Sequence, residues 1–388
     1  MARAIVGAAV WFAFAATSTG QPRGAPPRGN SFNKLDRNGD GRVTRDEFPR
    51  QIERLFDEID ADGDGVITPE EDAAFRRSAS DAGGRPKLPD TIRAELDVPY
   101  AGTDNPHQQL DLLAPKTPAS EDPLPLIVFI HGGAWRGGDR REGLSMLVRL
   151  VAGGQYAAAT VDYRLSGEAT WPAQIHDCKA AIRWLRANAE KFQIDPDRIG
   201  VIGLSAGGHL AAMLGVSGDV ERLEGKLGEH GDVSSRVNCV VDEYGPTELL
   251  VMSEFPGDVE HDEPDSPESR LIGGPIQEHQ EAARGASPIT YVSADDPPFL
   301  IVHGTEDPLV PYDQSERFYD ALEQEGVEAI FVTVEGGGHG GFRSAELDRR
   351  IGLFFGKYLR GEESEIPIDP ITPGQKRADA RPALPKRK

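Results

Sequence analysis

Short apolar runs that end in glycine-rich turns alternate with longer helical stretches between residues 91 and 360. This alternation is typical of a mostly parallel sheet flanked by helices, because parallel neighbours need long crossover connections. The candidate strands are 126–130, 156–161, 199–202, 237–241, 299–302 and 329–334, and the candidate helices include 174–192 and 313–325. The sequence therefore predicts an α/β fold with a doubly wound sheet.

Composition and charge exclude several classes of protein. The chain has 388 residues, of which 38% are hydrophobic, so it can bury a large core. Lys and Arg total 42 against 64 Asp and Glu, and the net charge of −22 repels polyanions. Nucleic acid is therefore not an expected partner. Cys178 and Cys239 form no C-x-x-C pair, which excludes a disulfide framework and a cysteine zinc site and leaves at most one bridge.

The ends of the chain and one internal segment differ in composition from the rest. Residues 1–20 combine Arg3, an apolar run and small residues that suit cleavage, so they predict a secretory signal peptide, with a retained anchor as the alternative. We expect the mature protein to be secreted or periplasmic and to leave the membrane after cleavage. Residues 78–90 have linker composition, and 361–388, with five prolines, predict a disordered tail.

Two twelve-residue stretches, 36–47 and 60–71, place oxygen ligands at the spacing of an EF-hand loop. Calcium prefers six to eight oxygens, and Gly41 and Gly65 allow the sharp turn at position six. The expected ligands are Asp36, Asn38, Asp40, the Arg42 carbonyl and Glu47 in the first loop, and Asp60, Asp62, Asp64, the Val66 carbonyl and Glu71 in the second. The alternative is a pair of solvated acidic loops. We predict an all-α calcium-binding module at 30–77.

The spacing of the two loops departs from the usual EF-hand pair. They start 24 residues apart, so 48–59 must form one helix that serves both loops. This leaves open whether the loops pair face to face, although position eight is apolar in both, as Val43 and Ile67. The segment resembles the short calcium modules attached to exported bacterial proteins, which leaves a protein partner of the module open.

A serine lies between a candidate strand and a helical run. Ser205 is the centre of Gly-Leu-Ser-Ala-Gly at 203–207, directly after the strand at 199–202 and directly before the run at 208–214. This context predicts a nucleophile elbow, in which a strained turn exposes the hydroxyl and glycines relieve backbone crowding. An ordinary turn is the alternative.

The turn His-Gly-Gly-Ala-Trp at 131–135 follows another candidate strand. It resembles the HGGG-type motif, whose amides stabilise negative charge on a carbonyl oxygen. We expect the donors to be the amides of Gly133, Ala134 and Ala206, with a plain tight turn as the alternative.

Asp307 and His339 follow the last two candidate strands. A hydroxyl needs a base to become a nucleophile, and a carboxylate fixes the tautomer of that base. His339 lies in a glycine-rich loop that can reach Ser205, whereas His131, His303 and His209 suit structural roles. Glu306 competes with Asp307 for the acid, but Asp307 fits the His-Gly-x-x-Asp-x-x-Val-Pro pattern.

Residues 91–360, which are 270 of 388, resemble the α/β-hydrolase superfamily in the esterase branch that joins bacterial carboxylesterases with acetyl-xylan and feruloyl esterases. Further short motifs agree with this branch, namely Asp-Tyr-Arg-Leu at 162–165, Trp-Pro-Ala-Gln-Ile at 171–175 and Ala-Ser-Pro-Ile at 286–289. The resemblance implies a serine carboxylesterase that works through an acyl-enzyme with the catalytic residues Ser205, Asp307 and His339. It implies no cofactor for the chemistry, so calcium would be structural.

The substrate is expected to be a small ester or an acylated polysaccharide, with acetyl or feruloyl groups on plant or algal chains as examples. Residues 240–280 hold eleven acidic residues against Arg270. If they overhang the site they should repel uronate-rich chains, and the alternative is a solvated acidic loop. Two other functions remain open, a secreted prolyl-oligopeptidase-like serine peptidase and a catalytically silent scaffold that binds a partner through calcium.

Overall fold

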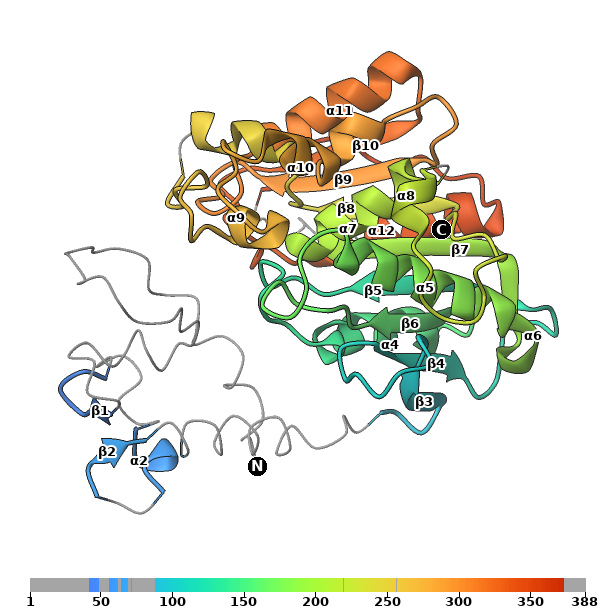
Figure 1. The fold of residues 1–388 in the computed structure, drawn as a ribbon. Helices are drawn as coiled ribbons and strands as arrows, with labels where there is room; N and C mark the ends of the chain where they lie inside the picture. Colours follow the sequence, from blue (N-terminus) through green and yellow to red (C-terminus); the bar gives the residue numbers. More distant parts are fainter. Residues whose placement is uncertain are drawn as a thin grey trace, which may run out of the picture. The chain divides into compact units, whose positions relative to one another are not determined.

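The computed structural model describes residues 42–48, 56–61, 64–68, 71 and 88–372, except 219 and 256. The chain divides into two compact units, Met1–Leu88 and Pro89–Lys388 (Figure 1). The boundary between the units falls within the linker predicted at 78–90. The predicted signal peptide and most of that linker lie outside the described residues.

The larger unit contains an eight-stranded sheet in the order β10-β9-β8-β7-β5-β6-β4-β3 (Figure 1). The strands are β3 (Ile92–Pro99), β4 (Gln109–Pro115), β5 (Leu124–Ile130), β6 (Ala157–Val161), β7 (Ile194–Leu204), β8 (Cys239–Glu243), β9 (Phe299–Gly304) and β10 (Ala329–Val334). The six strands from β5 to β10 pair in parallel, while β4 is antiparallel to β3 and to β6. The predicted doubly wound, mostly parallel sheet is confirmed.

The sequence analysis does not predict β3 and β4. In β3, Arg93, Glu95 and Asp97 alternate with apolar residues, and most of the strand is exposed or half-buried. That is the pattern of an antiparallel edge strand, which a search for the continuous apolar runs of buried parallel strands passes over.

Helices cover both faces of the sheet. They are α4 (Leu144–Ala152), α5 (Ala173–Ala187), α6 (Ala189–Phe192), α7 (Ala206–Val216), α8 (Glu221–Glu224), α9 (Pro267–Ile272), α10 (Gln280–Gly285), α11 (Asp313–Glu325) and α12 (Ala345–Arg360), with 3-10 turns η2 (Arg140–Gly143), η3 (Leu249–Glu254) and η4 (Pro288–Tyr291). The expected helix 174–192 is two helices, because Asn188 leaves helical geometry and its side-chain amide donates to the Trp184 carbonyl.

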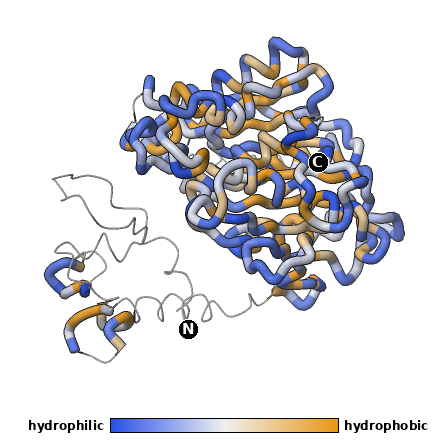
Figure 2. The backbone as a smooth tube through the Cα atoms, viewed as in Figure 1, coloured by the Kyte–Doolittle hydropathy of each residue, from blue (hydrophilic) through white to orange (hydrophobic). Residues whose placement is uncertain are grey.

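The alternation of side chains along β8 shows which helix covers which face. A side chain at Gly200 of β7 would meet Cys239 and Phe355 of α12, whereas one at Gly215 of α7 would meet Val240. Successive strand residues point to opposite faces, so α12 and α7 pack on opposite sides of β8. Every residue of β5 and β6 is buried. In Figure 2 hydrophobic residues, in orange, are frequent along these central strands.

The prediction of a disordered tail at 361–388 is wrong for 361–372. The Ile371 amide donates to the Thr333 carbonyl at 2.8 Å, and the Glu335 amide donates to the Ile371 carbonyl at 2.9 Å. Ile366 and Ile371 are buried. The edge strand β10 offers unpaired backbone groups, and this segment satisfies some of them. Residues 373–388 lie outside the described part.

The smaller unit contains a short two-stranded ladder. β1 (Val43–Thr44) pairs antiparallel with β2 (Val66–Ile67), and Val43 lies opposite Ile67. The two loops therefore pair face to face, which the sequence analysis leaves open. A small core consists of Val43, Phe48, Phe56, Ile59 and Ile67, of which Phe56 and Ile59 belong to the helix α2 (Phe56–Ile59). The helix expected at 48–59 is thus present at its end, but its first residue, Phe48, lies in a bend and is not helical, and residues 49–55 lie outside the described part.

Cys178 and Cys239 are free and buried, so the bridge that the sequence leaves open does not form. Within the described ranges, the structure contains no helix with the length and hydropathy needed to cross a bilayer.

Candidate active site

Ser205 occupies the sharp turn between β7 and α7, with φ 55° and ψ −121°. Two glycines make this turn possible. A side chain at Gly203 would collide with the Gly207 carbonyl, and one at Gly207 would collide with the Ile130 carbonyl at the end of β5. The Ser205 amide donates to the Glu243 carbonyl at 2.9 Å, which fixes the turn against β8. The hydroxyl is thus held at the carboxyl edge of the sheet in strained backbone geometry.

Three distant segments meet at this hydroxyl. The Ser205 Oγ lies 2.9 Å from His339 Nε2, and His339 Nδ1 lies 2.7 Å from Asp307 Oδ2. An ionised carboxylate only accepts hydrogen bonds, so Nδ1 carries the proton and Nε2 accepts the one that Ser205 donates. The arrangement can remove a proton from the serine hydroxyl and stabilise the resulting imidazolium.

Asp307 is held by four hydrogen-bond donors. Oδ1 accepts from the Leu309 amide at 2.8 Å and the Val310 amide at 3.0 Å, and Oδ2 accepts from His339 and also from His303 Nε2 at 3.2 Å. Burial acts to raise the pKa of Asp307, but hydrogen bonds from His303 and His339 outweigh it and hold the pKa well below its usual range. The competing residue Glu306 is exposed. The bond from His303 to Asp307 is a contact that sequence reasoning missed, although both residues lie in the pattern that identified Asp307.

His339 lies in a loop between β10 and α12. Its side chain is 16% exposed, and the Tyr244 ring packs edge-on against it with the ring centres 4.8 Å apart. Gly340 and Gly341 follow with φ of 72°, a conformation that glycine adopts without strain. The imidazole is therefore accessible from solvent and supported on one side by an aromatic ring.

The turn at 131–135 lies directly against the nucleophile. A side chain at Gly132 would be 2.9 Å from the Leu204 carbonyl and 3.4 Å from Ser205 Cβ. The Tyr163 hydroxyl donates to the His131 carbonyl at 3.0 Å. The phenol ring of Tyr163 also stacks on the imidazole ring of His131, with ring centres 4.3 Å apart. Tyr163 thus satisfies that carbonyl and holds the turn in place, a role that the sequence analysis does not assign.

The three amides that the sequence analysis assigns to an oxyanion follow the ends of two neighbouring strands, β5 and β7. Among the described residues, no hydrogen-bond acceptor contacts the amides of Gly133, Ala134 and Ala206. Gly133 has φ of 105° and Ala134 has φ of 54°, so the turn is left-handed at both positions. Ala134 stands in this conformation where glycine would be less strained. These amides can stabilise charge on a carbonyl oxygen bound at Ser205.

His209 lies buried beneath the turn. Its Nε2 donates to the Ala286 carbonyl at 2.7 Å, and its Nδ1 accepts from Trp135 Nε1 at 3.2 Å. Burial lowers the pKa of His209 to about 4, and burial likewise lowers that of His131 to about 4. The structure therefore gives these two histidines packing and hydrogen-bonding roles.

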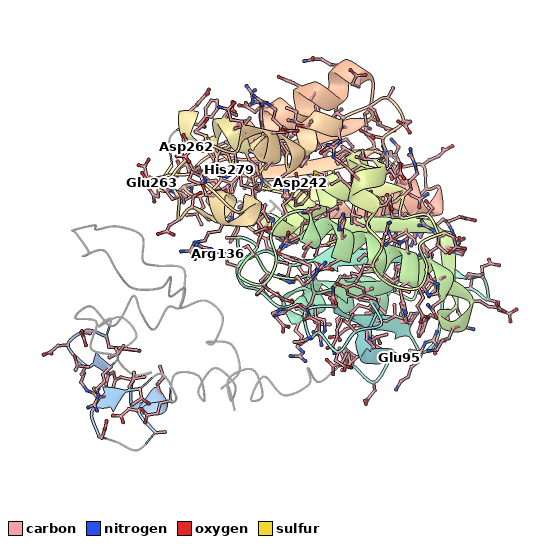
Figure 3. All side chains as sticks on the ribbon, in the orientation of Figure 1. Glu95, Arg136, Asp242, Asp262, Glu263 and His279 are labelled. Atoms are coloured by element: carbon pink, nitrogen blue, oxygen red, sulfur yellow. The ribbon has the colours of Figure 1, made fainter. Side chains whose placement is uncertain are left out.

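The acidic segment 240–280 borders the site. The Asp258 amide donates to the Pro308 carbonyl beside Asp307, and the Trp171 amide donates to the Leu271 carbonyl. Asp242, Glu243 and Glu268 are buried. In Figure 3 the side chains of Asp262 and Glu263 lie at the outer edge of this unit, while Asp242 lies within it. Part of the segment's charge is thus internal, so it acts less on approaching substrates than its composition predicts.

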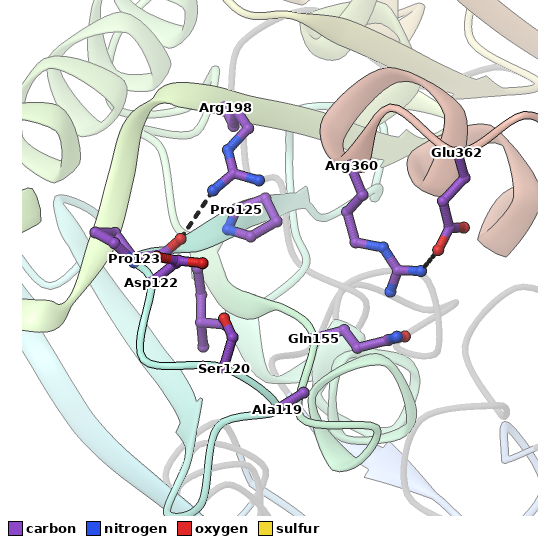
Figure 4. Close-up of a pocket in the computed structure, with 10 residues that line it drawn as sticks. Ala119, Ser120, Asp122, Pro123, Pro125, Gln155, Arg198, Arg360 and Glu362 are labelled. Atoms are coloured by element: carbon purple, nitrogen blue, oxygen red, sulfur yellow. Dashed lines mark hydrogen bonds and ion pairs between the residues drawn. The ribbon is translucent and has the colours of Figure 1, made fainter.

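A cavity of about 290 Å³ lies elsewhere, next to the amino ends of β5 and β7 (Figure 4). Polar residues that line it include Ser120, Asp122, Gln155, Arg198, Arg360 and Glu362. Arg198 donates to the Pro123 carbonyl at 2.9 Å, and Arg360 pairs with Glu362. The cavity is at the opposite end of the strands from Ser205, and its two arginines already have partners. It does not compete as a catalytic site.

In the described parts of the two predicted calcium loops, the glutamates at position twelve bond to backbone amides of their own loops. Glu47 Oε2 accepts from the Thr44 amide at 2.9 Å, and Glu71 Oε2 accepts from the Thr68 amide at the same distance. Glu71 Oε1 also accepts from the Ala61 amide at 3.0 Å, which brings position twelve next to the start of its loop.

Asp60 Oδ1 and Oδ2 accept from the amides of Asp64 and Gly65 at 3.1 and 3.0 Å, as the sharp turn requires. Four predicted ligands, namely Asp36, Asn38, Asp40 and Asp62, lie outside the described residues. Within the described ranges, no three His, Cys, Asp or Glu residues gather as a metal site.

Comparisons with known proteins agree on the class of this fold. The BD-FAE family matches residues 110–322, and the EF-hand family matches 30–50 and 52–71. Esterase LipC of Mycobacterium tuberculosis (strain ATCC 25618 / H37Rv) is 35% identical over 264 residues, which are 66% of this chain and 64% of that protein. The chain thus spans less than two thirds of the length of this relative.

Two solved structures are also similar. A truncated form of a carbohydrate esterase from gut microbiota is 34% identical, with a TM-score of 0.64 over 70% of this chain and 98% of that one. A bifunctional GH43-CE protein of Bacteroides eggerthii is 33% identical, with a TM-score of 0.63 over 70% of this chain and 36% of that one.

Proposed function

Because the chain belongs to the BD-FAE family of α/β-hydrolases, we propose that it is a serine esterase that hydrolyses short-chain carboxylic esters. The observation that carries the proposal is the pair of hydrogen bonds that joins Ser205 to His339 at 2.9 Å and His339 to Asp307 at 2.7 Å. The similarity to esterases supports the same class of reaction.

The proposed reaction uses the site in two steps. His339 Nε2 removes the Ser205 proton as Oγ attacks the ester carbonyl, and the amides of Gly133, Ala134 and Ala206 stabilise the oxyanion. His339 then gives the proton to the leaving alcohol, which leaves an acyl group on Ser205. A water molecule, deprotonated by His339, attacks this acyl-enzyme, the acyl–Oγ bond breaks to release the acid, and His339 returns the proton to Ser205 Oγ. Asp307 stays ionised throughout and stabilises the imidazolium.

A fluorophosphonate probe tests the proposal. It should label Ser205, as mapped by mass spectrometry, because labelling needs the nucleophile, the base and the oxyanion amides together. Ser205→Ala should abolish labelling and lower kcat for a nitrophenyl acetate ester about 10³-fold or more, while the melting temperature changes little. Labelling at another residue, or full activity in this variant, would contradict the assignment.

The substrate is proposed to be an acetyl or feruloyl ester on a plant or algal polysaccharide. This proposal is supported by the two similar solved structures, one of which is called a carbohydrate esterase and the other a bifunctional GH43-CE protein. Release of acid from acetylated xylan, feruloylated arabinoxylan and acetylated pectin should be compared with that from nitrophenyl acetate. We expect xylan esters to be cleaved faster than pectin esters, because exposed acids such as Glu263 lie in the segment that borders the site. Faster deacetylation of pectin would overturn the charge argument.

The EF-hand module is proposed to bind calcium through its two loops and to act structurally. The support comes from the paired position-eight residues Val43 and Ile67 and from the inward-folded carboxylates of Glu47 and Glu71. Calcium, when bound, would supply charge that holds these carboxylates together. Titration with calcium, followed by calorimetry, should show saturable binding that Glu71→Gln weakens.

We also propose that the protein is secreted or periplasmic, on the evidence of the apolar run after Arg3 and the small residues that follow it. Expression of the full sequence with fractionation should recover a shortened protein outside the cytoplasm. A full-length protein in the cytoplasm would contradict this.

A further inference from the structure

Glu243, the last residue of β8, contacts both the nucleophile turn and the loop of the base. Its backbone carbonyl accepts the Ser205 amide at 2.9 Å. Its carboxylate accepts from Arg343 Nη2 at 2.8 Å, and Arg343 lies four positions after His339. Glu243 therefore connects the segment that carries Ser205 with the segment that carries His339, two residues that are 134 positions apart in the sequence.

The loop after His339 needs such a connection. Gly340 and Gly341 both have φ of 72°, and glycine at two successive positions gives the backbone wide conformational freedom. Directly beyond them, Phe342 packs edge-on against Tyr244 with ring centres 5.6 Å apart, and Arg343 reaches Glu243. These contacts hold the loop to the end of β8 immediately after its two glycines.

The ion pair is buried on one side. The Glu243 side chain is 2% exposed. Glu243 and Cys239 are four residues apart on β8, so their side chains point to the same face of the sheet. That face is the one covered by α12, because a side chain at Gly200 would contact both Cys239 and Phe355. Burial raises the pKa of Glu243, while the Arg343 guanidinium opposes that rise. Arg343 also donates to Asp348 Oδ1 in α12 at 3.2 Å. The guanidinium thus connects β8, the loop and α12.

We propose that Glu243 and Arg343 form a positioning pair that holds the His339 imidazole in line with Ser205 Oγ. The inference rests on the proposed esterase function. Neither side chain is assigned contact with substrate, so the pair acts through His339. A misplacement of about 1 Å in a reacting group can lower a rate about 10²-fold, which is the size of effect that such a pair can prevent.

Four variants test the pair with a soluble nitrophenyl ester. Arg343→Leu and Glu243→Leu should each lower kcat about 10- to 100-fold with KM within about twofold. Arg343→Leu should also lower the melting temperature, because the Glu243 carboxylate stays buried without its partner, whereas Glu243→Leu leaves Arg343 partly exposed and paired with Asp348. Glu243→Gln keeps an acceptor for Arg343 and should lose less activity. In the double variant Glu243→Leu and Arg343→Leu no buried charge is left without a partner, since Asp348 is partly exposed and lies 3.6 Å from Arg149, so the melting temperature should return from the Arg343→Leu value toward the wild-type value.

The double variant separates positioning from stability. If the pair positions His339, kcat stays low although the melting temperature recovers, and the rate of fluorophosphonate labelling at Ser205 stays low as well. Recovery of kcat together with the melting temperature would show a purely structural pair and overturn the inference. Wild-type kcat in both single leucine variants would also overturn it.

Arg317→Leu is the matched control. Arg317 lies on α11 and pairs with Glu248 at 2.6 Å, and it is not part of the loop that carries His339. This variant should leave kcat unchanged. The proposed function and the positioning pair are tested by different variants. The proposed function requires only that Ser205→Ala abolish turnover. Inactive Ser205→Ala together with fully active Arg343→Leu would reject the positioning pair alone.

Discussion

The histidines around the site differ in chemistry because their hydrogen-bond partners differ. His339 has a carboxylate on one nitrogen and a hydroxyl on the other, and it is partly exposed. His303 Nε2 faces two acceptors, Asp307 Oδ2 and the Val310 carbonyl, so that nitrogen carries the proton and Nδ1 accepts from the Ser315 hydroxyl at 2.7 Å. His303 is therefore a fixed donor to the acid, while His339 can exchange a proton with Ser205.

His209 gives a prediction for acid stability. Both nitrogens already have partners in the neutral form, and protonation would direct a second N–H at the indole donor of Trp135. The folded pKa is about 4, below the ordinary 6.5, so the unfolded chain binds the proton first as pH falls. This residue should therefore remove about 2 kcal/mol from the free energy of unfolding between pH 8 and pH 5.

Urea unfolding of His209→Gln at those two pH values checks this. Glutamine can bond the same two partners without titrating, so the variant should lose less stability on acidification than the wild type. His279→Gln, at an exposed position, is the control and should keep the wild-type difference. An identical pH dependence in His209→Gln would show that another group controls acid stability.

At the scale of single elements, glycines in the strand–turn–helix unit of β7 and α7 differ from a glycine in α12 in the space around them. Gly203 and Gly207 have no room for a side chain because backbone carbonyls occupy that space. Gly352 in α12 has open space around it, and its φ is an ordinary helical value. The same substitution should therefore have opposite effects at the two kinds of position.

We expect Gly203→Ala to lower the melting temperature and to abolish fluorophosphonate labelling, because the added methyl group must displace the Gly207 carbonyl. Gly352→Ala should stabilise the protein by about 0.5–1 kcal/mol, since alanine has the higher helix propensity, and should leave activity unchanged. Thermal melts and ester assays on both variants measure these outcomes. Normal activity in Gly203→Ala would mean that the elbow relaxes more than its geometry indicates.

At the scale of the whole molecule, the chain has two compact units with separate cores. In the described part of the smaller unit the core consists of five buried residues, a core of a size that contributes little hydrophobic stability by itself. Carboxylates that face each other repel without a cation, so loss of calcium should unfold this unit first.

Calcium chelation should therefore lower the melting temperature of the smaller unit and leave most ester hydrolysis intact. Calorimetry with and without a chelator, together with a nitrophenyl acetate assay, measures both. The control is a truncated chain that begins at Pro89, which should show no response to the chelator. Loss of hydrolysis in step with calcium removal would show that the two units are coupled.

The sequence alone determined the sheet class, because apolar runs and glycine turns are local patterns set by backbone geometry. It also placed Ser205 in an elbow, since the glycines at 203 and 207 and the strand and helix around them are contiguous. The choice of Asp307 over Glu306 came from a local spacing as well, and the structure places Asp307 at His339.

Tertiary structure decided what depends on segments distant in the sequence. The pairing of Glu243 with Arg343, the hydrogen bond from Tyr163 to the His131 carbonyl, and the attachment of Ile371 to β10 join residues with no shared local pattern. Their partners are fixed only when the sheet brings strand ends and loops together, because hydrogen bonds and ion pairs form over distances of about 3 Å that sequence separation does not encode.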